Sequence, residues 1–577
     1  MPTNALGIDV AGLDVSAFLT GARAAFVVAS VAWLLFSMRV RRPGWLLAGV
    51  LAANAFVWLE TNYPLRQVYG LPLSRDRVGN LALCQVVVAG NSPIRSPQLG
   101  QLHFEPFWGA FVALSSGFDP ERALRVYPFF ALIMAVGFVL SLYFGLRPLD
   151  GSETRWERVI VAGFATLLSS APFEYTGIYR QPWMMTFLLK PNHALGLVLF
   201  PIVLAVFARA RGLRGRLAAG LLLHLLGWVF VLHMGYVCAG LLLHAALSFL
   251  TRHPERRRDL VDVAVTIGIN VLVVSPYIVM LFLGYPFMDR NPLMTIAETS
   301  PHLLEVTARM APWLALGAWG AVVLWRRGDR VSRVWVAQLM AALLIWASYL
   351  VLSRLQLARE RDEIYYWIRF LTAALAGIGA WDLTRRAAER LRRPVPDAVQ
   401  AAVVAALVLP LSLPYWWDPR RMDPYFAGSQ APLDARLRDM AEYLRRETPR
   451  DAVVIGDGDV SRYVSALAGR RVLVADNLNQ PSDVGTRFNM QDAILTDASG
   501  AAVEELASYG ARWRASTWYA VVTPRWLACP TATAPTCAER GLTLAEVRGL
   551  PHLDERAFWG DSSGEFVAIF RLRTNGH

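Results

Sequence analysis

The sequence has 577 residues, of which 55% are hydrophobic and only 18% are charged. Soluble domains carry about 25% charged residues, and a single hydrophobic core stops growing near about 250–300 residues. This composition excludes a soluble enzyme and a disordered scaffold, so we expect an integral membrane protein with a soluble part. The net charge of +12 raises the question of a nucleic-acid partner, and the positions of the basic residues answer it.

Arginine supplies nearly all of the basic charge, because the chain contains a single lysine, Lys190. Arginine clusters alternate along the chain with apolar runs near membrane-spanning length, about 20 residues. Short basic loops stay on the cytoplasmic side of a membrane, so we expect these clusters to face the cytoplasm and predict no nucleic-acid partner. The clusters are Arg39/Arg41/Arg42, Arg147/Arg155/Arg158, Arg209/Arg211/Arg214/Arg216, Arg252/Arg256/Arg257/Arg258, Arg326/Arg327/Arg330/Arg333 and Arg385/Arg386/Arg390/Arg392/Arg393.

The apolar runs predict a mainly α-helical membrane domain over residues 1–417, embedded in the lipid bilayer of the cell (inner) membrane. With the arginine clusters inside, both termini face outward. The apolar stretch Phe104–Phe118 is interpreted as an interfacial or re-entrant helix within a long outer loop, about 61–123. Another full span would place the later arginine clusters on the outer side of the membrane. The predicted spans, about twelve, are 17–38, 44–60, 124–146, 157–172, 192–208, 216–232, 235–250, 259–283, 304–325, 333–353, 367–384 and 396–416.

Residues 418–577 differ in character, because their apolar runs shorten to strand length and alternate with helical patterns. This alternation predicts a small α/β domain. The topology places that domain outside the cell, or in the periplasm where an outer membrane exists. The predicted helices are 433–446, 461–468 and 500–508, and the predicted strands are 453–456, 471–475, 518–522 and 565–572.

Two of the four cysteines, Cys529 and Cys537, bracket a loop rich in proline and threonine in this domain. Disulfides persist in oxidising compartments, so an outer location predicts a Cys529–Cys537 bridge, with two free thiols as the alternative. No nearby histidine or cysteine completes a zinc ligand set. We predict no metal and no cofactor.

The outer loop gathers charged and amide side chains directly above the membrane. Asp76 stands between Arg75 and Arg77, whose positive charge keeps a carboxylate ionised. An ionised aspartate can accept a proton from a hydroxyl, and the two arginines can hold a phosphate. A surface ion pair without chemistry is the alternative.

Three features follow one another in this loop: Asp76 near its start, a Gly-x-x-Pro step at Gly90 and Pro93, and an aromatic and proline patch leading into ALSSGFDPERALR. Their order resembles that of the C-type (GT-C) membrane glycosyltransferases, and RVLVADN after SALAGRR resembles the outer domain of such enzymes. Two features depart from the family pattern. Asn80 stands where many relatives have a histidine, and the loop follows the second predicted span rather than the first.

The resemblance implies an inverting transfer of a sugar from a polyprenyl-phosphate donor to an acceptor hydroxyl of a glycan, lipid or protein on the outer face. The loop carboxylate of that family is the catalytic base, which corresponds to Asp76 here. Glu60, where the second span meets the loop, is the reserve base, and Glu105 beside His103 is a third possibility. A helix-end carboxylate without chemistry is the alternative for both.

Further polar residues on the outer side are candidates to bind the substrate or the lipid phosphate. Lys190 is a compact point charge in a chain that otherwise uses arginine, although a chance survivor of that bias is the alternative. Arg369 falls at the membrane edge, where an unpaired charge is costly. The full set is Arg75, Arg77, Asn80, His103, Glu105, Arg180, Lys190, His193 and Arg369.

Two other motifs receive structural interpretations. Tyr365, Tyr366 and Trp367 fit an aromatic belt at the membrane interface. The segment Gly456–Asp459 lacks a Walker lysine and the GxGxxG spacing, so it predicts a turn at a strand end rather than a phosphate loop.

The rival functions are a membrane transporter or flippase, a polysaccharide polymerase or ligase with a periplasmic glycan-binding domain, and a non-catalytic assembly protein. A transporter would place charged residues at mid-membrane on broken helices. Asp262 lies near a predicted cytoplasmic end, and most other charges cluster at the outer surface, which disfavours transport.

Overall fold

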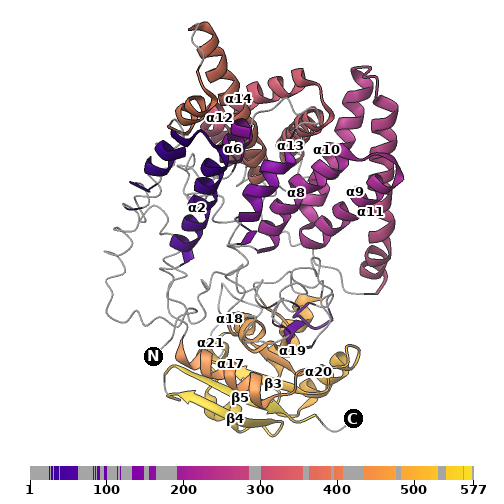
Figure 1. Ribbon diagram of the computed structural model, residues 1–577. Coiled ribbons are helices and arrows are strands. Elements are labelled where there is room, and N and C mark those ends of the chain that lie inside the picture. The colour runs from indigo at the N-terminus through magenta and orange to yellow at the C-terminus, as the bar shows by residue number, and fades with distance from the viewer. Residues whose placement is uncertain are drawn as a thin grey trace.

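The computed structural model describes a helical part that reaches residue 406 and an α/β part that begins at residue 434. Figure 1 shows the helical part above the α/β part. The described ranges are 31–37, 39–62, 87–90, 96–100, 136–147, 155–163, 191–284, 300–354, 363–391, 395–406, 434–475, 483–529, 541–562 and 564–574, with a few single residues between them.

The helical part consists of long helices that are apolar on most of their circumference, as expected for helices surrounded by other helices and lipid. Leu250 and Leu272 are 78% and 72% exposed. The helices are α2 (Pro43–Asn62), α6 (Arg155–Gly163), α8 (Pro191–Arg209), α9 (Gly212–Val229), α10 (Val231–Leu250), α11 (Arg256–Gly284), α12 (Ser300–Arg327), α13 (Arg330–Arg354) and α14 (Glu363–Arg390).

Within the described ranges, three helices are long and apolar enough to cross a membrane: Val231–Leu250, Arg256–Pro276 and Arg330–Ser348. Shorter apolar helices are Pro43–Ala53, Val136–Gly145, Leu195–Arg209 and Asp397–Ala406. The count of about twelve spans stays a prediction. One predicted boundary was wrong, because α9 and α10 are separated at the extended residue Phe230 and not at 233–234.

Helices α12 and α14 approach so closely that their backbones touch at glycines. A Cβ on Gly320 would lie 1.9 Å from the carbonyl oxygen of Leu375. Small residues permit this approach, and they are typical of helix pairs in membranes.

On the same helix α14, Trp367 is buried, with its ring 4.4 Å from that of Phe200 on α8. This side chain therefore packs between helices, and its predicted position at the membrane interface stays a prediction.

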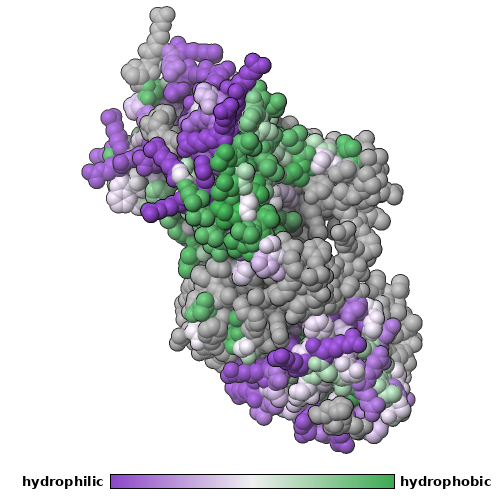
Figure 2. All heavy atoms as spheres, turned by 90° about the vertical axis from the view of Figure 1, so that its right-hand side faces the viewer, coloured by the Kyte–Doolittle hydropathy of each residue, from purple (hydrophilic) through white to green (hydrophobic). Residues whose placement is uncertain are grey.

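The turns α8–α9, α10–α11 and α12–α13 carry arginine clusters, and their ion pairs bring these turns together. Arg330 Nη2 lies 2.5 Å from Asp262 Oδ2, and Arg333 Nη1 lies 2.9 Å from Asp259 Oδ2. Arg216 Nε, from α9, lies 2.6 Å from Asp262 Oδ1. Figure 2 shows hydrophilic residues gathered at the end of the helical part remote from the α/β part, with a hydrophobic band between. We call the end of the helical part that carries these three turns the arginine end.

The α/β part contains a five-stranded sheet in the order β2-β1-β3-β5-β4. Strands β1, β2 and β3 are parallel, and the β4–β5 hairpin adds antiparallel to β3. The elements are α17 (Ala435–Glu447), β1 (Val453–Gly456), α18 (Gly458–Tyr463), a π-helical turn η4 (Val464–Ala468), β2 (Arg471–Val472), α19 (Val484–Ala493), α20 (Ala501–Ala511), β3 (Trp518–Val522), α21 (Pro524–Ala528), α22 (Leu544–Arg548), β4 (Leu553–Gly560) and β5 (Phe566–Leu572).

The sequence located most of these strands. The predictions at 453–456 and 518–522 are confirmed residue by residue, and β5 starts one residue later than expected. Strand β2 is shorter than predicted, ending at Val472. Strand β4 was missed because its Asp554, Glu555 and Arg556 interrupt the apolar pattern at the edge of the sheet.

The segment after β1 passes directly into a helix, so the predicted turn is reduced to Asp457, the one residue between β1 and α18. Asp457 caps α18 by accepting a hydrogen bond from the Val460 backbone N–H at 2.8 Å. Its other oxygen accepts a hydrogen bond from Thr523 Oγ1 at 2.6 Å. The Asp457 carboxylate is therefore used within the fold.

Candidate functional site

The outer loop and the α/β part share a sheet edge. The Leu99 backbone N–H donates to the carbonyl of Val472 at 2.8 Å, and the Val472 N–H donates to the carbonyl of Pro97 at 2.9 Å. Gln98 and Val472 form a parallel bridge. Residues 97–99 therefore extend the sheet beyond β2, and the loop is held on the same side as the α/β part.

Arg487 on α19 binds backbone carbonyls at this edge of the sheet. Its side chain is fully buried, and Nη1 donates to the carbonyl oxygens of Leu99 at 2.5 Å and Leu473 at 3.0 Å. Its Nε donates to Asp483 Oδ1 at 2.8 Å. A buried guanidinium needs several acceptors to offset its desolvation, and the loop carbonyl supplies one of them.

A tyrosine supports the Arg487–Asp483 pair. The Tyr509 hydroxyl donates to Asp483 Oδ2 at 2.6 Å, and the Arg487 guanidinium lies 5.4 Å from the centroid of the Tyr509 ring. Burial raises the pKa of Tyr509 above its ordinary value, and the hydrogen bond to the Asp483 carboxylate raises it further. The hydroxyl thus keeps its proton and orients Asp483 toward Arg487.

The loop is also packed against the α/β part. Leu99 is fully buried in the core of that part. Gly100 has φ +74°, and a Cβ there would lie 2.5 Å from the Trp513 ring. Gln85, earlier in the loop, also lies close to the α/β part, because a Cβ on Gly469 would lie 3.0 Å from the Gln85 carbonyl oxygen. Two stretches of the loop therefore rest on neighbouring surfaces of the α/β part.

Most predicted site residues lie outside the described residues: Asp76, Arg75, Arg77, Asn80, His103, Glu105, Arg180 and Lys190. The members of this set that belong to the outer loop flank the held stretch in sequence, since Asn80 precedes the buried Ala82 by two residues and His103 follows Gly100 by three. Gly90, the glycine of the Gly-x-x-Pro step, has φ +96°, a conformation that suits glycine.

Three further candidates lie at helix ends where the structure describes the backbone and not the side chain: Glu60 in α2, His193 in α8 and Arg369 in α14. Helices α8 and α14 both run toward the arginine end, where Arg209 and Arg390 close them. Their first two turns, with His193 and Arg369, are therefore at the opposite end of the helical part, which faces the α/β part (Figure 1).

Cys529 is disulfide-bonded. Its partner lies outside the described residues, as does Cys537, so the predicted pairing with Cys537 stays a prediction. In the part of the chain that the structure describes, no three His, Cys, Asp or Glu residues come together in a group that could hold a metal ion.

Sequence reasoning missed Arg487, Gln98 and Trp513. An arginine within an amphipathic helix is usually solvated, so nothing local distinguishes Arg487 from its neighbours. The glycine at position 100, directly after Leu99, is the sequence signal that could have indicated a close backbone approach, and in the structure it has φ +74°.

The class of fold that these parts define is the GT-C fold of membrane glycosyltransferases, as the sequence predicted. ArnT from Cupriavidus metallidurans, in a crystal structure bound to undecaprenyl phosphate, aligns over 92% of this chain and 98% of its own, with 14% identity and a TM-score of 0.51. Its apo structure gives 13% identity and a TM-score of 0.50 over the same shares.

A second solved structure is the archaeal oligosaccharyltransferase AglB from Archaeoglobus fulgidus, in complex with an inhibitory peptide and a dolichol-phosphate. It aligns over 90% of this chain and 74% of its own, with 12% identity and a TM-score of 0.48. No protein-family model and no curated protein sequence matches the chain.

Proposed function

We propose that this protein is an integral membrane glycosyltransferase that moves a sugar from a polyprenyl-phosphate donor to an acceptor hydroxyl on the outer face of the membrane. The observation that carries the proposal is the fold shared with ArnT, which was crystallised with undecaprenyl phosphate, over nearly the full length of both chains. The acceptor is a glycan, a lipid or a protein.

The charge distribution supports the orientation. Basic turns stay in the cytoplasm, so the arginine end faces inward and the α/β part, residues 418–577, faces the periplasm or the cell exterior. The outer loop lies on the same side as the α/β part, because the two share the sheet edge at Leu99 and Val472. Donor and acceptor then meet between the loop and the outer ends of the helices.

In the proposed mechanism, Asp76 takes the proton of the acceptor hydroxyl as its oxygen attacks the anomeric carbon from the face opposite the leaving phosphate. The new glycosidic bond forms while the bond from carbon to phosphate oxygen breaks, so the configuration inverts. The cations Arg75, Arg77, Lys190 and Arg369 stabilise the departing polyprenyl phosphate, and Arg180, His193, Asn80, His103 and Glu105 are further contacts. No cofactor takes part.

The test is transfer activity of the Asp76→Asn variant with polyprenyl-phosphate sugar donors. Loss of a general base lowers the rate by about 10²–10⁴-fold, with insertion and thermal stability unchanged. Asp439→Asn is the matched control, because Asp439 is an exposed residue of α17 and the charge change is the same. Full activity of Asp76→Asn together with inactivity of Glu60→Gln would reassign the base to Glu60. Full activity of both variants would contradict the carboxylate mechanism.

A further inference from the structure

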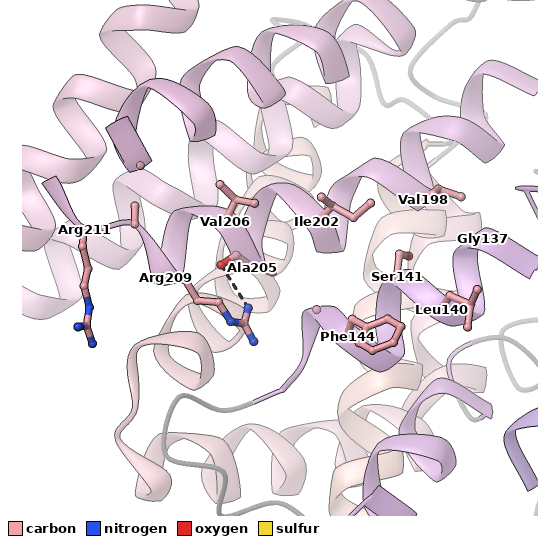
Figure 3. A pocket seen from close by; sticks show the side chains of 13 residues that line it. Gly137, Leu140, Ser141, Phe144, Val198, Ile202, Ala205, Val206, Arg209 and Arg211 are labelled. Atoms are coloured by element: carbon pink, nitrogen blue, oxygen red, sulfur yellow. Dashed lines mark hydrogen bonds between the residues drawn. The ribbon is translucent and has the colours of Figure 1, made fainter. Parts of the chain in front are cut away.

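A groove of about 610 Å³ lies on the side of the helical part, between helix Val136–Gly145 and α8, and extends to the α8–α9 turn. Figure 3 shows Leu140 and Phe144 on one side and Val198, Ile202 and Val206 on the other. This wall is apolar, and Phe144 is 60% exposed. A wall of this kind at the depth of the hydrocarbon suits a lipid chain.

The groove ends in two arginines. Arg209 Nη1 donates to the Ala205 carbonyl at 3.2 Å and Nη2 donates to the Arg147 carbonyl at 2.5 Å, which holds the guanidinium across the end of the groove. Arg211 also lines this end, and its side chain stands on the far side of Arg209 from the apolar wall (Figure 3). The two residues place two positive charges at the boundary between the apolar wall and the polar arginine end.

These arginines differ from three buried or half-buried arginines at the same end. Arg216, Arg330 and Arg333 are paired with the carboxylates of α11. Among the residues that the structure describes, Arg209 and Arg211 have no carboxylate within ion-pair distance. Arg209 is half-buried and Arg211 is exposed, so both guanidinium groups can bind an anion from outside the chain.

The length of the groove indicates which lipid fits. Along α8 the lining extends from Val198 to Arg209, about 16 Å at the helical rise of about 1.5 Å per residue. Half of a bilayer core is about 15 Å. One acyl chain of one leaflet therefore matches the groove. A polyprenyl donor would present its phosphate at the opposite end, near the α/β part.

We propose that this groove binds an anionic phospholipid of the leaflet at the arginine end. The phosphodiester accepts hydrogen bonds from Arg209 and Arg211, and one acyl chain lies against Phe144, Ile202 and Val206. No covalent step is involved. The site is separate from the glycosyl-transfer site, so the inference does not depend on the proposed function.

The experiment uses the full chain in vesicles of phosphatidylcholine alone or of phosphatidylcholine and phosphatidylglycerol in equal parts. Native mass spectrometry counts the lipids that stay bound on release, and a thermal unfolding scan measures stabilisation. The wild type is expected to retain phosphatidylglycerol in preference to phosphatidylcholine and to unfold at a higher temperature in the mixed vesicles. The double variant Arg209→Gln/Arg211→Gln is expected to bind phosphatidylglycerol roughly thirtyfold more weakly, at about one kcal/mol per basic residue near the surface.

Two comparisons separate the groove from general surface charge. The control Arg257→Gln/Arg390→Gln removes two exposed charges at the same end outside the groove and should keep the wild-type preference. Ala205→Phe keeps every charge but fills the groove, and it should lose the lipid. Arg211→Gln alone leaves the Arg209 hydrogen bonds intact and should show part of the loss.

Three results would overturn the proposal. The first is equal retention of the two lipids by the wild type. The second is equal loss in the groove and control double variants, which would mean unspecific attraction to the surface. The third is that undecaprenyl phosphate displaces phosphatidylglycerol at equal concentration and that Ala205→Phe weakens the binding of both lipids. This result would assign the groove to the polyprenyl chain.

Discussion

Arg487 donates a hydrogen bond to the backbone carbonyl of Leu99, a residue 388 positions earlier in the chain. This contact joins the outer loop, which carries the proposed catalytic base, to a helix of the α/β part. The bond is buried, and it is one of several that make the loop an added edge of the sheet. The α/β part therefore holds the loop, and perturbing the contact should affect the loop before it affects the helical part.

Replacing Arg487 by lysine should release the loop. Lysine keeps the charge but lacks the planar fork that reaches Leu99, Leu473 and Asp483 together. Each hydrogen bond to a charged group contributes about 1.5–3 kcal/mol, so the α/β part should lose roughly 2–4 kcal/mol. Hydrogen exchange at the Leu99 and Val472 amides should accelerate at least tenfold, and glycosyl transfer should fall.

The matched control is Arg470→Lys. Arg470 is equally buried, and its hydrogen bonds go to Thr448, Arg445 and Ala468, all within the α/β part. It should destabilise that part to a similar extent with a smaller effect on the Leu99 amide. Equal acceleration at Leu99 in both variants would contradict a specific role for Arg487.

Gly100→Ala should displace the same loop by a steric route. The substitution places a Cβ 2.5 Å from the Trp513 ring at a residue with φ +74°. Left-handed backbone costs a residue with a side chain about 1–2 kcal/mol, and the clash adds to it. The melting temperature of the α/β part and the Trp513 fluorescence should both change.

Gly485→Ala provides the comparison for Gly100. Gly485 is an exposed residue of α19, and a Cβ at this position would meet no atom within 4 Å. Alanine in that helix should be neutral or stabilising by about 0.5–1 kcal/mol. A Gly100→Ala protein as stable as Gly485→Ala would show that the loop does not pack on Trp513 in solution.

The Tyr509–Asp483 hydrogen bond predicts a pH dependence at the alkaline side. The folded-state pKa of Tyr509 is raised above the ordinary value of 10.0, so its contribution to stability is complete below that pH. The contribution is lost as pH rises through the folded-state pKa, because the ionised tyrosine would be buried beside a carboxylate. Tyr509→Phe should lack this part of the alkaline loss. Thermal scans that start at about pH 9 and extend above about pH 10, where the loss begins, measure it. Parallel curves for the two proteins would contradict the assignment.

The ion pairs of the arginine end should be required for helix packing. Asp262 accepts from Arg216 and Arg330 and is almost fully buried. Among the described residues, Asp262→Asn leaves Arg216 without a carboxylate partner and leaves Arg330 paired with Asp259 alone. Breaking a buried ion pair costs about 3–5 kcal/mol. Glu389→Gln breaks only the exposed contact with Arg385 at 3.8 Å and should change stability by about 0–1 kcal/mol. Urea resistance in detergent compares the two. If the wild type transported a lipid and a stable Asp262→Asn protein did not, the result would instead favour a transporter.

The sequence by itself determined the membrane character, the basic turns and the positions of most strands. These properties are local, since they depend on runs of apolar residues, on arginines between them and on short apolar segments near turns. The resemblance of the loop and of RVLVADN to GT-C enzymes indicated the fold that the similarity to ArnT supports. The strand β4 escaped because edge strands with charged residues lack that local pattern.

Only the tertiary structure decided which distant residues meet. The sequence indicates neither that Leu99 belongs to the core of the α/β part nor that Trp367 packs against Phe200. It also does not show that Asp259 and Asp262 neutralise Arg330 and Arg333, while Arg209 and Arg211 close a groove. Each of these contacts joins segments far apart in the chain. Their formation depends on how helices and strands pack, which no local spacing encodes.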